Sequence, residues 1–408
     1  MKVGIFLPEI SPDRGGAYTF VETVVTGLVE TNDRDTVVVF HYGTVGDLAS
    51  QFDASRVTFH CLAESAAGRF AKKVWFQEVS SRLQKPLHLA ASLLGKPLPY
   101  PAGSPLDHAV KQREIDLLWF PTPFAEHVDV PYIATVWDLE HRTHPYFPEL
   151  GEHGEWRARD SYYADTLRRA TYVVTGTEVG RDEIARFYTV DRERVRVLPH
   201  PTPTFAIEAA KQLAPPLALP IGTPYVLYPA QFWSHKNHIG LLDGIAELAR
   251  RGTTVHCALV GSDKGNLAFV RAHAARLGIA DRVHFLGFVE RTDLVALYRH
   301  AAALAYTSLC GPENLPPLEA MALDCPVIAS DFPGAREQMG DAALLVDTLD
   351  PRSLADAIER VLTSPELRRD LQARGRARAA RYTQVEFCHD LEAIIDDFRR
   401  RRALWGRA

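Results

Sequence analysis

Residues 306–347 read YTSLCGPENLPPLEAMALDCPVIASDFPGAREQMGDAALLVD, a pattern that predicts strand, loop, helix, strand, loop, helix and strand in that order. Asn314 is expected to cap the first helix, and Pro316 and Pro317 suit its first turn. One apolar face follows at helical spacing, at Leu318, Met321 and Ala322. Because a helix start presents backbone N–H groups and a positive dipole end, we expect an anion site here, best suited to a phosphate.

Glu319 lies one turn into this expected helix, where its carboxylate could accept two hydrogen bonds from the hydroxyls of a ribose. The amides of Asn314 and Leu315 and the carboxylate of Glu319 would then hold a diphosphate and a sugar together. A simpler interpretation is that Asn314 only caps the helix and Glu319 only complements its dipole. The segment taken by itself leaves both interpretations open.

The segment resembles the nucleotide-sugar signature of the family-4 retaining glycosyltransferases with the GT-B fold, usually E-G-F-G-L-P-x-L-E-A. Gly311 stands where the first glutamate is expected, and Glu313 lies two places later. The resemblance implies that Glu319 binds the donor ribose, whereas the role of the leading glutamate in holding the transferred sugar passes to Glu313 only as a hypothesis. The matching residues are Leu315, Pro316, Leu318, Glu319 and Ala320.

Length and composition fit a two-domain α/β protein. The chain has 408 residues, of which 46% are hydrophobic, and a formal net charge of −5, so no basic bias indicates a nucleic-acid partner. The opening MKVGIFLPEI is too short and too soon polar for a signal peptide or a membrane span, and we expect a cytoplasmic protein, with the inner face of the membrane as an alternative site. The cysteines are odd in number and lack metal-type spacing, which favours free thiols: Cys61, Cys257, Cys310, Cys325 and Cys388.

Two series of short apolar strands alternate with helical segments, and proline-rich residues 199–224 separate the series. We expect two Rossmann-like, doubly wound parallel-sheet domains facing a cleft, the GT-B fold that the resemblance implies. The boundaries expected are 1–200 for an acceptor domain and 205–384 for a donor domain, with a final helix at about 385–408 packing back on the first. The expected strands are 2–7, 36–40, 115–120, 132–136 and 171–175, then 225–228, 255–260, 282–285, 303–306, 326–329 and 343–346.

A glycine turn, Asp13-Arg14-Gly15-Gly16, follows the first expected strand and precedes a helix over 18–30. It lacks the full G-x-G-x-x-G fingerprint, and the chain has no P-loop, so a plain turn is one interpretation. In the resembled family, a glycine pair at this place lets the backbone approach the donor phosphate and the acceptor. The resemblance therefore assigns that role to Gly15 and Gly16.

The second series opens with YPAQFWSHKNHIGLL, residues 228–242. Lys236 lies between a buried strand and a helix, where its ammonium could neutralise the charge growing on a departing diphosphate, unless it is only solvated. The resembled family shows G-R-x(4–5)-K-N here, and only its final Lys-Asn is matched. Gln231 takes the place of the arginine and offers a neutral hydrogen bond, so charge stabilisation must depend on Lys236, the helix amides or a cation such as Arg14.

HFLGFVERTDLVALYRHA, residues 284–301, resembles the segment of the family that packs against the nucleobase. Phe288, next to Gly287, could cover the base, although strand residues of the core would look the same. Gly261 ends an apolar strand and is placed as a phosphate-side turn. These residues complete the expected donor site without identifying the base.

TVWDLEHRTHP, residues 135–145, follows a buried strand, so Asp138 and His141 are expected to project near the cleft. The resembled family often has His-Asp here, with the histidine contacting the transferred sugar, and Trp137 replaces that histidine. Asp138 carries over, and His141 is proposed as a hydrogen-bonding partner of the acceptor or of the donor sugar. A loop histidine that only caps or packs is the alternative.

Two basic regions and one acidic pair bear on partners. Residues 65–96 mix basic and apolar side chains, which suits contact with anionic lipid and a lipid-linked acceptor, or else a packed helical excursion. The basic run Arg399 to Arg402 before Trp405 is expected to be a solvated helix end. The only D-x-D candidate, Asp33-Arg34-Asp35, lies in a polar turn, and no catalytic metal is expected.

These observations favour a hexosyltransferase-type enzyme of cell-surface polysaccharide synthesis, such as that of O-antigen. It would move a sugar from a nucleotide sugar to a hydroxyl of a glycan or lipid-linked oligosaccharide, with no cofactor besides the donor. The resemblance implies retention of configuration, in which the leaving phosphate oxygen accepts the proton of the incoming hydroxyl. A GT-B epimerase or phosphorylase, and a non-catalytic sugar-nucleotide-binding partner, remain open alternatives.

Overall fold

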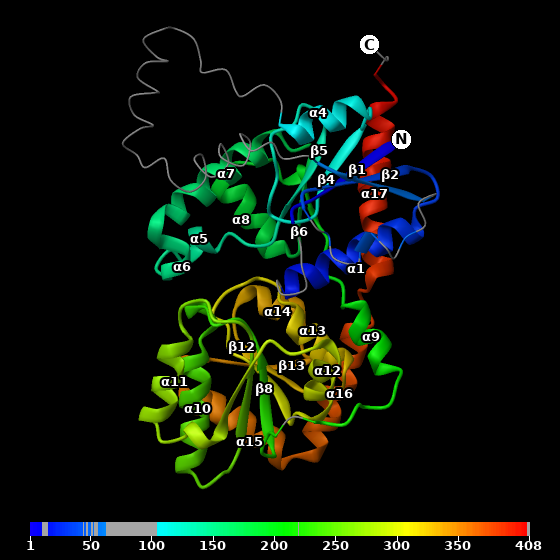
Figure 1. The fold of residues 1–408 in the computed structure, drawn as a ribbon. Helices are drawn as coiled ribbons and strands as arrows, with labels where there is room; N and C mark the ends of the chain where they lie inside the picture. Colours follow the sequence, from blue (N-terminus) through cyan, green and yellow to red (C-terminus); the bar gives the residue numbers. More distant parts are fainter. Residues whose placement is uncertain are drawn as a thin grey trace, which may run out of the picture.

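The computed structural model describes residues 1–9, 15–43, 45, 48–49, 52, 56–62, 104–218 and 220–405. They form two lobes, each a parallel sheet covered by helices on both faces (Figure 1). We call residues 1–200 together with the last helix the N-terminal lobe, and residues 225–379 the C-terminal lobe. This is the GT-B architecture of two facing Rossmann-like domains that the sequence predicts.

The described sheet of the N-terminal lobe has the strand order β3-β2-β1-β4-β5-β6-β7, with every pairing parallel. Its central strands are buried on both faces, which is why they read as unbroken apolar runs. The two edge strands were not predicted, because β3 is half exposed and β7 has three residues. The strands are β1 (Lys2–Leu7), β2 (Thr36–His41), β3 (Val57–Cys61), β4 (Leu117–Phe120), β5 (Tyr132–Val136), β6 (Tyr172–Thr175) and β7 (Val195–Val197).

The C-terminal sheet has the order β10-β9-β8-β11-β12-β13, again all parallel. The strand order reverses between β8 and β11, so the loops that follow these two strands border the switch point where ligands of open α/β sheets bind. All the strands expected from the sequence are confirmed. They are β8 (Tyr225–Pro229), β9 (His256–Val260), β10 (Val283–Gly287), β11 (Ala303–Tyr306), β12 (Val327–Ser330) and β13 (Ala343–Val346).

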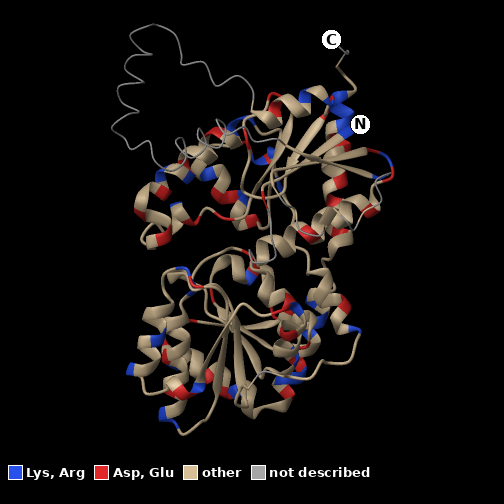
Figure 2. Cartoon of the chain, viewed as in Figure 1, with Lys and Arg blue, Asp and Glu red and all other residues tan. Residues whose placement is uncertain are grey.

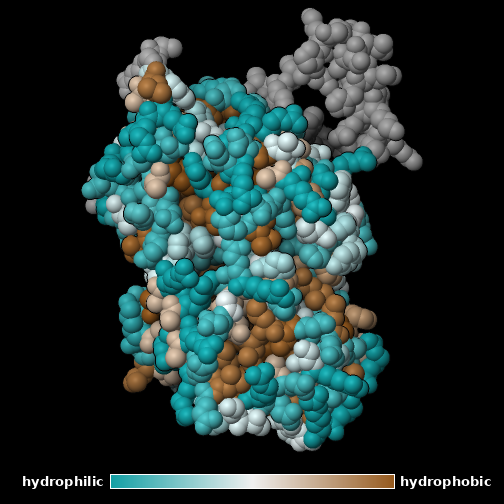
Figure 3. All heavy atoms as spheres, turned by 180° about the vertical axis from the view of Figure 1, so that it is seen from behind, coloured by the Kyte–Doolittle hydropathy of each residue, from teal (hydrophilic) through white to brown (hydrophobic). Residues whose placement is uncertain are grey.

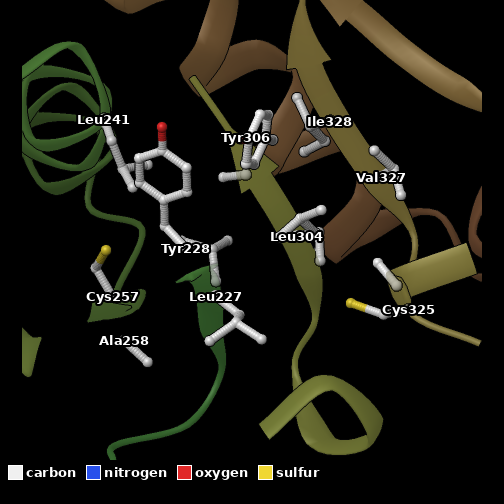
Figure 4. Close-up of a cluster of buried hydrophobic side chains, with 14 of the residues drawn as sticks. Leu227, Tyr228, Leu241, Cys257, Ala258, Leu304, Tyr306, Cys325, Val327 and Ile328 are labelled. Atoms are coloured by element: carbon white, nitrogen blue, oxygen red, sulfur yellow. The ribbon is translucent and has the colours of Figure 1, made fainter. Parts of the chain in front are cut away.

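Side chains of this sheet and of its covering helices form the core of the C-terminal lobe. Figure 4 shows Leu227, Leu304 and Ile328 on neighbouring strands, with Leu241 of a flanking helix beside Tyr228. Tyr228 is fully buried there, and its hydroxyl donates to the backbone carbonyl of Lys236 (2.5 Å). The core thereby fixes the loop after β8 that carries this lysine.

Helices cover both sheets. Those of the N-terminal lobe are α1 (Gly16–Thr31), α4 (Pro105–Gln112), α5 (Glu140–Thr143), α6 (Pro148–Gly151), α7 (Glu155–Arg169), α8 (Glu178–Tyr188) and α17 (Gln384–Arg402). Those of the C-terminal lobe and the linker are α9 (Thr204–Ala210), α10 (His238–Arg250), α11 (Leu267–Arg276), α12 (Arg291–His300), α13 (Leu315–Ala322), α14 (Pro333–Met339), α15 (Pro351–Thr363) and α16 (Pro365–Ala379). Short 3-10 turns are η4 (Glu152–Gly154), η5 (Arg192–Arg194), η6 (Ser234–Lys236) and η7 (Ala280–Arg282).

The chain crosses between the lobes twice, after β7 and before α17, and the two crossings touch. Thr202 donates its N–H to the carbonyl of Tyr382 (3.0 Å) and its hydroxyl to the carbonyl of Ala379 (2.8 Å). Beyond them α17 lies along α1, at the right of the upper lobe in Figure 1. A Cβ at Gly27 of α1 would lie 2.6 Å from Cys388 Sγ, so glycine permits this close approach.

Charged residues of both signs are spread over the two lobes (Figure 2). The arginines at the end of α17 pair with acids, as Arg399 does with Asp35 (2.6 Å) and Arg401 with Asp397 (3.2 Å). The opposite face is largely hydrophilic, with apolar atoms visible over part of the C-terminal lobe (Figure 3). No helix in the described ranges has both the length and the apolar content needed to cross a bilayer. The basic segment 65–96 lies outside the described residues.

Candidate active site

A cavity of about 210 Å³ lies between the lobes, at the ends of β5, β8 and β11. It brings together four of the residues expected from the sequence: Asp138 from the N-terminal lobe, and Lys236, Glu313 and Asn314 from the C-terminal lobe. Its other lining residues are Trp137, Glu140, Leu150, Arg159, His200, His235, Cys310 and Gly311. Both lobes therefore contribute polar side chains to one enclosed space.

Lys236 is the central cation of the C-terminal wall. Its Nζ donates to Tyr306 Oη (3.2 Å), Ser308 Oγ (3.3 Å) and Asn314 Oδ1 (3.4 Å). No carboxylate of the described residues forms an ion pair with it. Burial alone lowers the pKa of Lys236, but its interactions with Tyr306 and Cys310 outweigh that effect and raise the pKa, so the ammonium is charged at neutral pH.

The start of α13 differs from the expectation. Asn314 occupies the N-cap position, but its side chain does not cap the helix: Nδ2 donates to the carbonyl of Gly311 (2.8 Å), and Oδ1 accepts from Tyr306 Oη (2.7 Å). Its own N–H donates to Gln338 Oε1 (3.1 Å). Because Pro316 and Pro317 have no N–H, Leu315 keeps the only backbone donor among the first three residues of the helix. The expected cluster of free amides is therefore reduced to one, and Asn314 acts as a partner of the lysine.

Glu313 reaches across to the N-terminal lobe. Its Oε1 accepts from the backbone N–H of His200 (3.0 Å), and Oε2 lies 3.9 Å from His200 Nδ1. A Cβ at Gly176 would lie 1.4 Å from Oε2, so the glycine leaves the space that the carboxyl fills. The side chain is 4% exposed, and burial raises the pKa of Glu313 well above its ordinary value. Glu313 thus lines the cavity while its carboxyl bridges the lobes.

On the opposite wall, Asp138 is held by a cation that sequence reasoning missed. Arg159 of α7 donates from Nη2 to Asp138 Oδ1 (2.9 Å), and the same oxygen accepts from the N–H of Glu140 (3.1 Å). Both Asp138 and Arg159 line the cavity. Arg159 follows Asp138 by 21 residues, and no sequence motif marked it.

Glu140 is the second lining residue that the sequence did not single out. Its Oε1 accepts from the N–H of Gly311 in the C-terminal lobe (2.7 Å). Its Oε2 accepts from Thr143 Oγ1 (3.1 Å) and contacts His144 Nδ1. No periodicity marks this residue, because the strand β5 ends at Val136 and α5 begins at Glu140.

His141 does not line the cavity and is corrected to a residue of the lobe interior. It is 0% exposed, its Nε2 is hydrogen-bonded to Tyr188 Oη (2.9 Å), and its ring stacks on Tyr163 with centroids 5.7 Å apart. Burial lowers its pKa to about 4, so the imidazole is neutral. The reason is that α5 begins at Glu140 and turns the following residue toward the core.

Two cavity-lining aromatic residues of the N-terminal lobe carry polar atoms without partners. Trp137 Nε1 and His200 Nδ1 are buried and form no hydrogen bond with any described residue. The Trp137 ring meets Phe20 edge-on, with centroids 5.6 Å apart, which fixes its position. Buried polar atoms are nearly always satisfied, so unsatisfied ones at a cavity wall indicate a ligand that supplies the missing partner.

Within the described ranges, four glutamates accept hydrogen bonds from backbone N–H groups of the opposite lobe, and we call them the interlobe glutamates. Glu140 and Glu149 reach from the N-terminal lobe, and Glu313 and Glu337 from the C-terminal lobe. The bonds are Gly311 N to Glu140 (2.7 Å), His235 N to Glu149 (2.9 Å), His200 N to Glu313 (3.0 Å), and Glu178 N and Val179 N to Glu337 (2.6 and 3.3 Å). The lobes are thus closed on each other around the cavity.

The glycine turn lies against the start of α13. Gly15 has φ 63°, which favours glycine, and it is the N-cap residue of α1. A Cβ at Gly16 would lie 3.7 Å from Leu315 Cδ1, and the buried Leu315 side chain packs in the core of the N-terminal lobe. Gly15, Gly16 and Leu315 are therefore brought together across the lobes, while Asp13 and Arg14 lie outside the described residues.

Glu319 does not line the cavity. Its carboxyl is 6% exposed, and Oε2 accepts from Tyr298 Oη (2.7 Å). Burial raises the pKa of Glu319 to about 7, against the opposing effect of the Tyr298 hydrogen bond.

The other expected donor-site residues lie near the ends of β8, β9 and β10, outside the cavity lining. Gln231 accepts from Trp233 Nε1 (3.1 Å). Gly261 has φ 152°, and a Cβ there would lie 2.3 Å from the carbonyl oxygen of Ala230, so glycine is required. Phe288 is 57% exposed. The three residues follow neighbouring strands of the C-terminal sheet and do not line the cavity.

The described residues hold no group of three or more His, Cys, Asp or Glu side chains arranged for a metal ion. Asp35 of the D-x-D candidate pairs with Arg399 (2.6 Å), which gives it a structural role between β2 and α17.

Comparisons with known proteins give the family. Residues 43–204 match the family model described as Glycosyltransferase Family 4, and residues 210–378 match Glycosyl transferases group 1. The chain is 28% identical over 211 residues to O-antigen chain mannosyltransferase RfbU of Salmonella typhimurium, which covers 49% of this chain and 54% of that protein. It is 29% identical over 256 residues to a D-inositol 3-phosphate glycosyltransferase of Nocardia farcinica, with 59% and 54% covered. These matches span about half the length of the curated relatives.

A crystal structure of HepE from Anabaena in complex with UDP and glucose superimposes with a TM-score of 0.67 at 18% identity, covering 97% of this chain and 100% of that one. At this identity the likeness concerns the fold. Taken together, two glycosyltransferase family models match consecutive parts of the chain, and its paired Rossmann-like lobes have the GT-B fold.

Proposed function

We propose that the protein transfers a sugar from a nucleoside diphosphate sugar to a hydroxyl of a glycan or lipid-linked saccharide, retaining the anomeric configuration and using no catalytic metal. The name of the Salmonella relative refers to the O-antigen chain, and the HepE structure holds UDP and glucose, which support this donor and acceptor class. Synthesis of a cell-surface polysaccharide is the setting that these relatives favour.

The observation that carries the proposal is the ammonium of Lys236 at the cavity wall, which forms no ion pair with any carboxylate that the structure describes. A buried charge without a counter-ion is strongly unfavourable unless a ligand supplies one. Its protein partners are two hydroxyls and an amide oxygen, so its full charge remains available to an anion. A diphosphate fits this requirement and would replace the missing carboxylate.

The chemistry follows from where charge develops. As the bond from the sugar to the leaving phosphate oxygen breaks, negative charge grows on the diphosphate, and a fixed ammonium stabilises it without reorganisation. Tyr306 and Asn314 hold Lys236 in place, because Tyr306 Oη donates to Asn314 Oδ1 (2.7 Å), which also accepts from the lysine. With one free amide at Leu315, the proposed stabilisation depends more on this side chain than on the helix start.

Retention requires that the acceptor hydroxyl attack on the face from which the phosphate leaves. The new bond forms from the acceptor oxygen to the anomeric carbon, and the hydroxyl proton passes to the departing phosphate oxygen. No protein base is needed for this step. Asp138 suits a positioning role, since Arg159 already holds its carboxylate (2.9 Å).

The nucleoside is proposed to extend past α13 toward the ends of β9 and β10. Tyr298 holds one carboxylate oxygen of Glu319 (2.7 Å), which leaves the other for ribose hydroxyls. Gln231 and Gly261 are placed for the diphosphate side, and the exposed ring of Phe288 for the base. Gly15 and Gly16 close this path from the N-terminal lobe.

The test is a panel of UDP-, GDP- and dTDP-sugars, incubated with the protein without an acceptor and analysed by mass spectrometry. Slow release of the nucleoside diphosphate from one donor is the expected result, because water replaces the acceptor. Interconversion of sugars would assign an epimerase, phosphate-dependent cleavage a phosphorylase, and binding without turnover a non-catalytic partner. Each of these three outcomes would overturn the transferase assignment.

A further inference from the structure

The C-terminal lobe cannot supply an acid at the position of Gly311. This residue has φ 100°, a conformation that side chains rarely adopt. A Cβ there would lie 3.1 Å from Asn314 Oδ1, so the neighbouring amide would also have to move. The N–H of Gly311 points instead to a carboxylate of the other lobe, Glu140 (2.7 Å).

Glu313, the nearer acid in the sequence, is poorly suited to bind a sugar hydroxyl. Its Oε1 is occupied by the N–H of His200 (3.0 Å), and its Oε2 fills the space over Gly176. Burial raises its pKa well above the ordinary range, which favours a neutral carboxyl. A neutral, enclosed carboxyl is a weaker hydroxyl acceptor than an ionised one.

Glu140 is the second glutamate that lines the cavity, and the Gly311 N–H takes one lone pair of its Oε1 (2.7 Å). It lines the cavity from the N-terminal lobe, and its Oε2 is fixed by Thr143 Oγ1 (3.1 Å) and by His144. The hydrogen bond to Glu140 raises the pKa of His144, so the imidazole favours its charged form beside this carboxylate. Asp138 beside it is paired with Arg159 (2.9 Å), whereas Oε1 of Glu140 keeps a second lone pair that can accept from a sugar hydroxyl.

We propose that Glu140 binds hydroxyls of the transferred sugar, from the N-terminal lobe, in place of the acid that is absent at Gly311. The inference rests on the proposed function. Lys236 and the nucleoside site belong to the C-terminal lobe, whereas Glu140 reaches Gly311 only when the lobes are closed. A nucleotide alone therefore binds without Glu140, and a nucleotide sugar needs it.

Trp137 supports the same assignment independently. Its Nε1 is a buried donor without a partner at the cavity wall, three positions before Glu140 in the chain. A sugar hydroxyl can accept from the indole N–H and donate to the carboxylate at the same time. The pair would select donors with a hydroxyl at the position that faces the N-terminal lobe.

The test compares Glu140→Gln with Glu149→Gln by calorimetry, using the panel nucleotide sugar that the wild type binds most tightly and its parent nucleoside diphosphate. Glu149 is the matched control, since it also bonds an N–H of the opposite lobe (His235, 2.9 Å) but does not line the cavity. Glu140→Gln should weaken nucleotide-sugar binding about 10- to 100-fold, as expected for a lost charged hydrogen bond, and leave nucleotide binding within about twofold. Trp137→Phe, which keeps an aromatic ring but removes the indole N–H, should give a smaller loss of affinity for the same nucleotide sugar.

A Glu140→Gln protein with the wild-type ratio of the two affinities would overturn the inference. The inference would also be overturned if each variant weakened the affinities for the nucleotide sugar and for the nucleoside diphosphate by the same factor. That result would mean that both glutamates act only through the contact between the lobes. If the wild type releases nucleoside diphosphate from the donor while Glu140→Gln binds normally, only this inference fails. If the wild type binds no nucleotide sugar of the panel, the proposed function fails with it.

Discussion

Replacing Lys236 with methionine removes the charge and keeps the length of the side chain. In the structure, Nζ makes three hydrogen bonds of 3.2 to 3.4 Å to neutral oxygens and no ion pair with a described residue. Lys236→Met therefore breaks no salt bridge. It relieves the desolvation of a buried ammonium and gives up three long hydrogen bonds, two effects of opposite sign and similar size, each of several kcal/mol. We expect that the melting temperature of the ligand-free protein does not fall.

The effect on turnover should be large. An ammonium about 4 Å from a leaving phosphate contributes roughly 4 kcal/mol at the effective dielectric of a protein cleft. Loss of one fixed stabilising group of this kind lowers kcat by about 100- to 1,000-fold. Nucleotide affinity should weaken as well, because the diphosphate loses its counter-ion.

The assay is nucleoside diphosphate release from the best donor of the panel, with melting temperatures measured with and without nucleotide. Lys211→Met is the matched control, since Lys211 is an exposed lysine that pairs with Glu208 (2.7 Å) in the linker helix. A Lys236→Met protein that melts several degrees lower and turns over at the wild-type rate would refute the reasoning, because the lysine would then be a structural residue.

Three further predictions concern binding, closure and the glycine turn. Burial raises the pKa of Glu319 from 4.5 to about 7, so the folded state loses stability as the pH rises between these values. Nucleotide binding by the ionised carboxylate should strengthen above about pH 7. In calorimetry, Glu319→Gln should flatten this pH dependence of nucleotide binding. Burial alone would raise the pKa of Glu149, but the N–H groups of His235 lower it, so this interlobe contact is kept above pH 4.5 and lost as the pH falls below that value. Glu149→Ala should therefore increase the radius of gyration measured by X-ray scattering. An unchanged scattering profile would contradict this prediction. Gly15→Ala should lower stability by about 1 kcal/mol, because φ is 63° there, and should also lower donor turnover, whereas Gly154→Ala, at φ 83° and far from α13, should show the stability loss alone.

The sequence predicted the elements that depend on local pattern. Unbroken apolar runs identified the central strands, because a parallel sheet buries both faces of each strand. Lys236 and Asn314 were found because they follow two buried strands, β8 and β11, that border the switch point of the C-terminal sheet. The edge strands β3 and β7 lack that burial and escaped prediction.

Side-chain direction in loops was not predictable from the same pattern. His141 was expected to face the cleft and Glu140 was not singled out, yet the histidine turns into the lobe interior and the glutamate lines the cavity. The difference arises where the extended residues after β5 give way to α5, a change of one residue that no periodicity marks. Likewise, Asn314 sits at the N-cap position while its side chain serves Lys236.

By itself, then, the sequence determined two parallel sheets, the loops that end their central strands, and the cation and helix start in those loops, because these features depend on burial and local backbone preference. Only the tertiary structure decided which acids meet which amides across the cavity. Glu140 and Gly311 are 171 residues apart and belong to separately packed lobes. Their contact depends on how the two lobes dock, a geometry set by the whole interface and not by any local stretch of chain.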